Sequence, residues 1–173
     1  MYRYIKCSDV GSIEVYHASL TPIDGLSVEN ITDPDNLGVH FTKSYQDACA
    51  IASSRYKGGS TYIYKTNLSN LKVLQLPKDF DSWANVEVLR YLVSMSQYSE
   101  FSTRITSTPS RTKERAKSVR DIFKECGYNC LEYPNECEVG VLNNCLCVLD
   151  NSCIGSVELV DIVFVDDDGV IEG

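Results

Sequence analysis

The chain has 173 residues, of which 43% are hydrophobic and 10% aromatic, and its formal net charge is −8. This composition excludes an intrinsically disordered chain, and the length fits one domain over residues 1–173. The acidic balance disfavours a protein that binds nucleic acid or an anionic membrane through its overall charge.

The first half of the sequence predicts short strands around one helix. The segments are, in order, a strand over 12–19, a polar loop over 20–36, a strand over 38–42, a helix over 45–56, and strands over 60–68 and 71–76. Ser44 is placed to cap the helix, and Gly58 and Gly59 follow its end.

The second half predicts two helices followed by strands. The segments are a helix over 81–96, a Ser/Thr/Pro loop, a basic amphipathic helix over 110–127, and strands over 128–133, 144–150 and 156–166. In the second helix Val119, Ile122 and Phe123 are expected to face inward. Because strands and helices do not alternate regularly, we expect an α+β domain with two short sheets rather than a doubly wound parallel sheet.

Targeting signals and metal motifs are not evident. The N-terminus lacks a long apolar run and no segment is long enough to span a bilayer, so we expect no membrane contact and a cytoplasmic protein. Six of the eight cysteines fall between 126 and 153, without a CxxC pair. They are expected to be thiols in strands and loops, with no bound metal, and Cys145 and Cys147 should share one strand face.

Both histidines of the chain lie in H-x-[ST] patterns, as His17-Ala18-Ser19 and His40-Phe41-Thr42. On facing strands, one imidazole could serve as base and the other as acid of a two-histidine phosphoesterase. The pattern is generic, and only a loop separates its two copies.

Several segments in order resemble the ADP-ribosyltransferase superfamily, in its diphtheria-toxin and poly(ADP-ribose) polymerase-like branch. They are VYHAS, LGVHFTKSYQDACAIA, GYNCLEYPNECEVG and NNCLCVLD. The chain is also similar to the transferase domains of phage polyvalent proteins, and the resemblance extends from about residue 13 to 160. It implies an α+β fold with split mixed β-sheets packed with helices, NAD as cosubstrate, and a phage, toxin or injected effector protein.

The resemblance also implies roles for single residues. His17 would hydrogen-bond a ribose hydroxyl of NAD, the backbone of Ala18 would hold the carboxamide, and His40 would stack on nicotinamide in place of the commoner tyrosine. The NAD-binding residues implied are His17, Ala18, Ser19, His40, Phe41 and Tyr45. Taken without the resemblance, Phe41 reads as a core residue.

A carboxylate is required because cleavage of the nicotinamide–ribose bond creates an oxocarbenium-like centre. Counting back from the V-x-D element of 148–150, the family's acid position holds Cys145. The preceding loop offers Asn135-Glu136-Cys137-Glu138, so the implied catalytic residues are Glu138 first and Glu136 second.

The function expected from the sequence is NAD-dependent mono-ADP-ribosyl transfer to a macromolecular acceptor, either protein or nucleic acid. For a phage-encoded or injected protein, it would act in the host cytoplasm. Two alternatives stay open. One is a catalytically inactive binding module of the same fold, and the other is the two-histidine phosphoesterase.

Overall fold

The computed structural model describes residues 7–33, 36–78, 80, 85–92, 95–135 and 138–172. Its strands are β1 (Cys7–Ser19), β2 (Val39–Phe41), β3 (Gly59–Gln75), β4 (Cys130–Tyr133), β5 (Cys145–Val148), β6 (Glu158–Val165) and β7 (Ile171–Glu172). Its α-helices are α1 (Tyr45–Arg55), α2 (Asn85–Val88), α3 (Met95–Thr106) and α4 (Lys113–Glu125). Short 3₁₀ turns are η1 (Val28–Asn30), η2 (Leu89–Tyr91) and η3 (Asn151–Cys153).

Strand β3 is the centre of a mixed sheet, and other strands pair along both of its edges. β1 runs antiparallel to it along one edge, from Cys7 opposite Leu74 to Ser19 opposite Tyr62. Two strands divide the other edge, because β6 pairs antiparallel with residues 59–65 and β4 pairs parallel with residues 73–75. The sheet therefore splits into a β4–β5–β2 branch and a β6–β7 branch.

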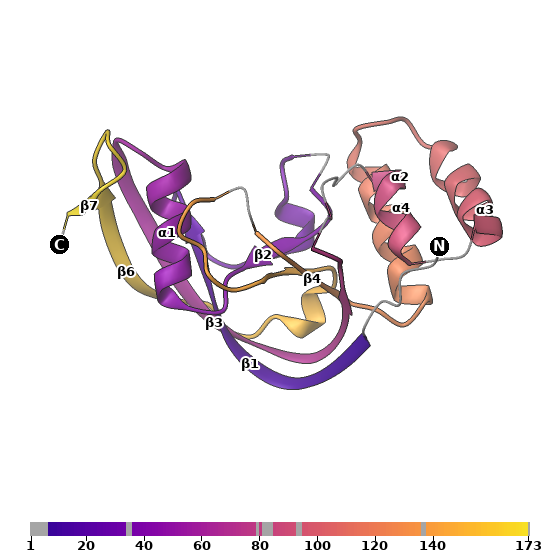
Figure 1. Ribbon diagram of the computed structural model, residues 1–173, viewed down its shortest axis with the longest axis horizontal. Helices are drawn as coiled ribbons and strands as arrows, with labels where there is room; N and C mark the ends of the chain where they lie inside the picture. Colours follow the sequence, from indigo (N-terminus) through magenta and orange to yellow (C-terminus); the bar gives the residue numbers. More distant parts are fainter. Residues whose placement is uncertain are drawn as a thin grey trace.

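The β4–β5–β2 branch curls back until it reaches β1. Tyr16 and Thr42 exchange both backbone hydrogen bonds, each 2.9 Å long, which joins β1 to the end of β2. The strands β1, β3, β4, β5 and β2 thus enclose a small barrel-like core, and Figure 1 shows the strong curvature of β1 and β3. The expected α+β class is confirmed, but the described strands form one connected sheet rather than two separate ones.

Alternation along the strands gives the curled sheet an inner face and an outer face. The inner face carries Val15, Phe41, Leu146 and Val148, which belong to one buried apolar cluster. The outer face of β4 and β5 carries a second cluster that the helices α2, α3 and α4 cover. Helix α1 covers a third, smaller cluster on β1, β3 and β6.

The expected caps and inward residues of two helices are confirmed. Ser44 caps α1, where its Oγ accepts a hydrogen bond from the N–H of Asp47 at 3.1 Å. In α4 the three residues expected to face inward, Val119, Ile122 and Phe123, are fully buried. Both helices therefore follow from local sequence signals.

Several elements differ from the sequence prediction. The two strands expected over 60–76 are one continuous strand, β3, which passes through Asn70 at a φ of 55°. Helix α3 occupies a Ser/Thr-rich segment where a loop was expected from residue 97 on, because Tyr98, Phe101 and Ile105 pack in the apolar cluster that α2, α3 and α4 cover. Tertiary packing there outweighs low helix propensity. The expected helix over 81–96 is represented by α2 and η2, while residues 81–84 and 93–94 lie outside the described residues.

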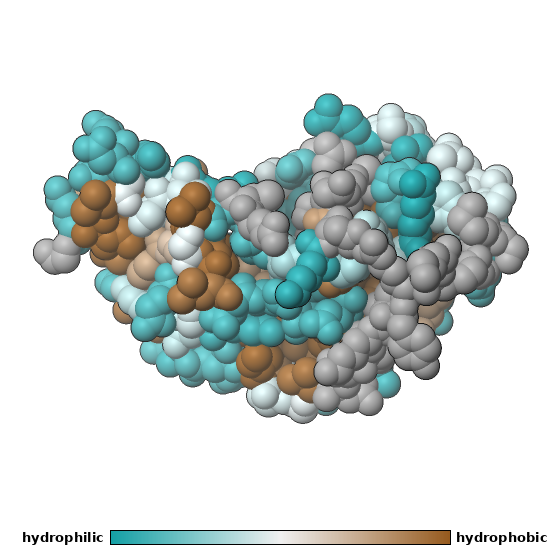
Figure 2. Space-filling view, viewed as in Figure 1, coloured by the Kyte–Doolittle hydropathy of each residue, from teal (hydrophilic) through white to brown (hydrophobic). Residues whose placement is uncertain are grey.

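The molecule is crescent-shaped, with α1, β6 and β7 at one end and the helices α2, α3 and α4 at the other. Figure 2 shows apolar surface gathered over the α1–β6–β7 end, and exposed apolar side chains there include Val139, Leu142 and Val170. No described helix has the length and apolar character needed to cross a bilayer.

Candidate functional site

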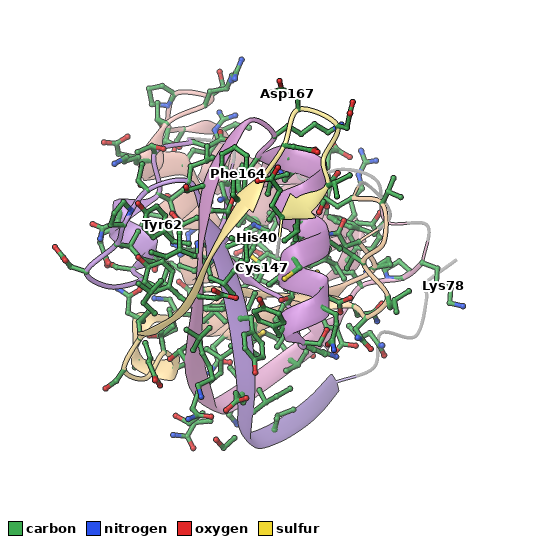
Figure 3. The ribbon with its side chains drawn as sticks, turned by 90° about the vertical axis from the view of Figure 1, so that its left-hand side faces the viewer. His40, Tyr62, Lys78, Cys147, Phe164 and Asp167 are labelled. Atoms are coloured by element: carbon green, nitrogen blue, oxygen red, sulfur yellow. The ribbon has the colours of Figure 1, made fainter. Side chains whose placement is uncertain are left out.

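His40 is the centre of a hydrogen-bonded chain on the outer face. Its Nε2 lies 2.7 Å from Asn36 Oδ1, and its Nδ1 lies 2.7 Å from the hydroxyl of Tyr133 on β4. The rings of His40 and Tyr133 meet edge to face, with centroids 5.5 Å apart. Figure 3 shows His40 beside Cys147, its partner across β2 and β5.

The direction of each hydrogen bond in this chain follows from one backbone donor. The N–H of Gly38 donates to Asn36 Oδ1 at 3.3 Å, so that atom is the amide's acceptor oxygen. His40 must then donate from Nε2 to the same oxygen, and its Nδ1 accepts the hydroxyl proton of Tyr133. His40 is therefore a neutral Nε2–H tautomer that is held at both nitrogens.

The electrostatic environment keeps His40 uncharged. Burial, and secondarily the neighbouring His17 and Arg55, lower its pKa from 6.5 to about 4. Burial also raises the pKa of Tyr133, with Cys145, Cys147 and Glu138 adding to the effect, so this hydroxyl stays protonated and remains a donor. At neutral pH the pair consists of a flat neutral imidazole and a protonated phenol.

Glu138, the first acid implied by the resemblance, lies in the β4–β5 loop against the last turn of α1. Its side chain is 13% exposed, and its Oε1 lies 3.5 Å from the Nε of Arg55. The charge of Glu138 acts on Tyr133 and that of Arg55 acts on His40, so this ion pair lies within electrostatic range of the hydrogen-bonded chain. We call Asn36, His40, Tyr133, Arg55 and Glu138 the outer-face cluster.

Asp47, in the first turn of α1, holds the far end of the loop that carries Glu138. Its buried carboxylate accepts hydrogen bonds from the N–H of Leu142 at 2.8 Å, the N–H of Asn143 at 3.3 Å and the Nδ2 of Asn143 at 2.8 Å. Burial alone would raise the pKa of Asp47, but these hydrogen bonds lower it below its usual value. The loop is therefore fastened to both ends of α1, at Asp47 and at Arg55.

His17 lies on the opposite face of the strand pair from the His40 ring. It shares the inner face with Val15, two residues earlier, and its ring lies 5.9 Å from that of the buried Phe41. Its Nδ1 donates to the carbonyl oxygen of His40 at 2.8 Å. Burial lowers the pKa of His17. The contact between the two histidines thus runs through the backbone of β2.

This arrangement removes the geometric basis of the phosphoesterase alternative. Such a site needs two imidazoles that converge on one phosphate, one of them protonated to act as acid. Here the rings of His17 and His40 project from opposite faces, and burial lowers the pKa of both.

The other residues implied for NAD binding do not converge with His40. Phe41 is 1% exposed and packs in the inner core, and Ala18 is buried under α1. The hydroxyl of Ser19, at the end of β1, donates a hydrogen bond to the carbonyl oxygen of Thr21. Tyr45 donates its hydroxyl to Asp161 on β6 at 2.5 Å, which directs it toward the β6–β7 branch. Of the six, His40 alone contributes its ring to the outer-face cluster.

The structure describes Cys145, which occupies the family's acid position, but not Glu136, the second implied glutamate. Cys145 is 1% exposed, and burial raises the pKa of its thiol to about 11. It lies near Asn135, whose Nδ2 is 3.6 Å from its Sγ. Glu136 lies outside the described residues. Within the described ranges, no group of three or more His, Cys, Asp or Glu side chains is arranged to hold a metal ion.

A second polar group, which the sequence did not single out, joins four segments at one end of the barrel. Glu132 on β4 accepts from Lys43 at 3.0 Å, from Asn144 at 3.1 Å and from Gln75 at 3.2 Å. Its side chain is 19% exposed. Burial opposes its ionisation, but the hydrogen bonds of Asn144 and Lys43 outweigh that effect and lower its pKa.

Most of the polar partners in these clusters carry no recognisable sequence signal. Asn36 reads as a turn former, Tyr133 and Glu132 as alternating strand residues, and Asp47 as part of a helix cap. Only the fold brings them together. A comparison of the chain with protein-family models, curated proteins and solved structures found no match.

Proposed function

We propose that this protein is an NAD-dependent mono-ADP-ribosyltransferase whose reaction site is the outer-face cluster. One observation carries the proposal. Glu138, which the resemblance implied, is paired with Arg55, and the charge of Arg55 acts on His40, which the resemblance implied from a distant part of the sequence. A carboxylate, a flat neutral ring and a cation are the groups that this chemistry requires.

Each group has a distinct task in the proposed reaction. The bond between the nicotinamide nitrogen and ribose C1′ breaks, and its electron pair leaves with nicotinamide. Glu138 stabilises the positive charge that develops on the ribose, and a nucleophile of a protein or nucleic-acid acceptor then bonds to C1′ and loses its proton. Arg55, which is 59% exposed, is available for the pyrophosphate of NAD.

The rings act by position rather than by proton transfer. His40 is neutral above pH 5 and held at both nitrogens, so it offers a fixed flat surface for nicotinamide beside Tyr133. His17 takes a supporting role in this proposal, because its Nδ1–H bond to the His40 carbonyl fixes the backbone beneath that ring. We therefore treat His17 as a positioning residue.

The decisive experiment measures nicotinamide released from NAD, by liquid chromatography, in the presence of a cell lysate as the source of acceptors. We expect Glu138→Gln to reduce the rate by about 100-fold or more, since one preorganised electrostatic group commonly contributes that much. The matched control is Glu158→Gln, because the Glu158 side chain is 70% exposed and lies on β6. A Glu138→Gln rate within a few fold of the wild type would contradict the acid assignment, and Glu136→Gln would then be measured.

Calorimetry with NAD separates the enzyme from the inactive binding module. Saturable NAD binding without nicotinamide release from the wild type supports the binding module. No binding at millimolar NAD contradicts both. Mass spectrometry of the lysate after incubation with labelled NAD then identifies the modified acceptor.

A further inference from the structure

A pocket of about 210 Å³ lies between the η1 segment and α4, and Asn36 lines it. Asn36 also bonds His40, so the pocket adjoins the outer-face cluster through that one side chain. The half-buried and buried residues of its lining are Val28, Ile31, Asn36, Ala116 and Arg120. The proposed transfer reaction assigns no role to it.

The two least exposed polar residues of the lining, Arg120 and Asn36, both offer hydrogen-bond donors. Arg120 is 8% exposed, and its Nη1 donates to the carbonyl of Leu37 at 3.0 Å. Across the part of the chain that the structure describes, no other hydrogen-bond or ion-pair partner of this guanidinium is found. The Oδ1 of Asn36 is occupied by His40 and Gly38, which leaves its Nδ2 hydrogens for a ligand.

These groups fit a carboxylate attached to an apolar body. With Nη1 engaged, the Nε–H and Nη2–H groups of Arg120 form the parallel fork that matches the two oxygens of a carboxylate. Val28, Ile31 and Ala116 supply apolar walls. The volume is below the roughly 300–1,000 Å³ of pockets that take drug-sized ligands, so the occupant is small.

Exposed charges of both signs line the rest of the pocket. Lys113, Glu114 and Lys117 come from α4, and Glu29 and Asp33 come from the facing loop. These charges are close to balanced and exposed to solvent. The buried positive charge of Arg120 therefore favours a negatively charged ligand.

We propose that this pocket is a binding site for a small organic carboxylate, gripped by Arg120 and Asn36 and connected to His40 through Asn36. The inference concerns binding alone and stands whether or not the protein transfers ADP-ribose.

Isothermal titration calorimetry on the full chain tests the ligand class, with benzoate as the probe. We expect saturable binding of benzoate and at least about tenfold weaker binding of benzamide, a neutral molecule of the same shape, because hydrogen bonds to a charged group are the stronger ones. Inorganic phosphate is the third probe. Binding of phosphate without benzoate, or equal binding of benzamide and benzoate, would overturn the proposal.

Two variants test the location. Arg120→Gln removes the charge and Ala116→Leu fills the pocket without changing charge, and both are expected to weaken benzoate binding about tenfold or more. Lys124→Gln is the control, since Lys124 is on the same helix, is 41% exposed, pairs with Asp121 and does not line the pocket, so the affinity of this variant should change little. If Arg120→Gln does not fold, Ala116→Leu decides. Unchanged benzoate affinity in a folded Ala116→Leu protein would overturn the site.

Nuclear magnetic resonance of the wild type supplies an independent readout. Benzoate should shift the imidazole resonances of His40 through Asn36 and leave those of His17, on the inner face, nearly unchanged. A benzoate-induced shift confined to His17 would contradict the proposed connection.

Discussion

The same local pattern, H-x-[ST], occurs twice, and its histidine lies on the inner face of the curled sheet in one copy and on the outer face in the other. In His17-Ala18-Ser19 the histidine points to the inner face, whereas in His40-Phe41-Thr42 the histidine points outward and the phenylalanine points inward. The pairing of Tyr16 with Thr42 sets this offset of one residue. Because strand side chains alternate, a one-residue offset in register exchanges the faces, so the pattern alone does not decide what its histidine contacts.

The two faces also differ in what their side chains contribute, the inner face mainly to stability and the outer face mainly to the candidate site. The inner face near β2 carries a buried apolar cluster, and the charges of Lys43 and Glu132 are paired with each other at one end of the barrel. The outer face holds a hydrogen-bonded polar chain between Asn36 and Tyr133. Substitutions on the inner face should therefore act mainly on the free energy of unfolding, and substitutions on the outer face mainly on binding and pH dependence.

The largest effect is expected for Phe41→Ala. Truncating this buried ring should lower the free energy of unfolding by about 3–5 kcal/mol, measured by urea denaturation. Its outer-face counterpart, His40→Phe, keeps a ring and loses two hydrogen bonds, so its cost should be about 1–3 kcal/mol. A larger loss for His40→Phe than for Phe41→Ala would contradict the division between the faces.

The second effect is a pH dependence of stability that originates on the outer face. The folded pKa of His40, about 4, is below its ordinary value of 6.5, so the unfolded chain binds the proton more readily between these values. Stability should then fall as the pH drops from 6.5 to about 4, by at most about 1.4 kcal/mol per pH unit. Urea midpoints across this window should show a smaller slope in His40→Phe than in wild type. Equal slopes in the two proteins would exclude His40 as a source.

The third effect concerns the loop that α1 holds. Asp47→Asn replaces one acceptor oxygen by a donor group and should cost about 1–3 kcal/mol. Hydrogen exchange of the Leu142 and Asn143 amides should accelerate, while the control Asp121→Asn, on α4 and paired there with Lys117 and Lys124, leaves them unchanged. If Glu138 is the catalytic acid, nicotinamide release should fall in Asp47→Asn as well. Unchanged exchange at both amides would show that Asp47 does not hold the loop.

Much of the secondary structure could be predicted from local signals, and the errors have tertiary causes. The caps at Ser44 and the inward residues of α4 were predicted, since they depend on neighbours along the chain. Helix α3 was not, because its Ser/Thr-rich sequence is helical only when its apolar side packs on the core. The continuity of β3 through Asn70 was also missed, since two separate strands were predicted over 60–68 and 71–76.

The candidate site was predicted less completely than the fold. The resemblance pointed to His40 and Glu138, and both lie in the outer-face cluster. It also pointed to Phe41 and Tyr45, which serve the core and the contact with Asp161 instead. The partners Asn36 and Tyr133 carry no signal of their own, because a turn asparagine and a strand tyrosine are common in every fold.

The sequence by itself determined the class of this protein: an α+β domain whose strands and capped helices follow from apolar spacing and turn residues, all of which are local properties. Only the tertiary structure decided which face each histidine occupies, because that depends on the pairing of β1 with β2. It also decided which side chains accompany Glu138 and how Arg120 lines a pocket beside Asn36. These groups come from segments far apart in the sequence, and no local sequence pattern indicates that they lie close together in the folded protein.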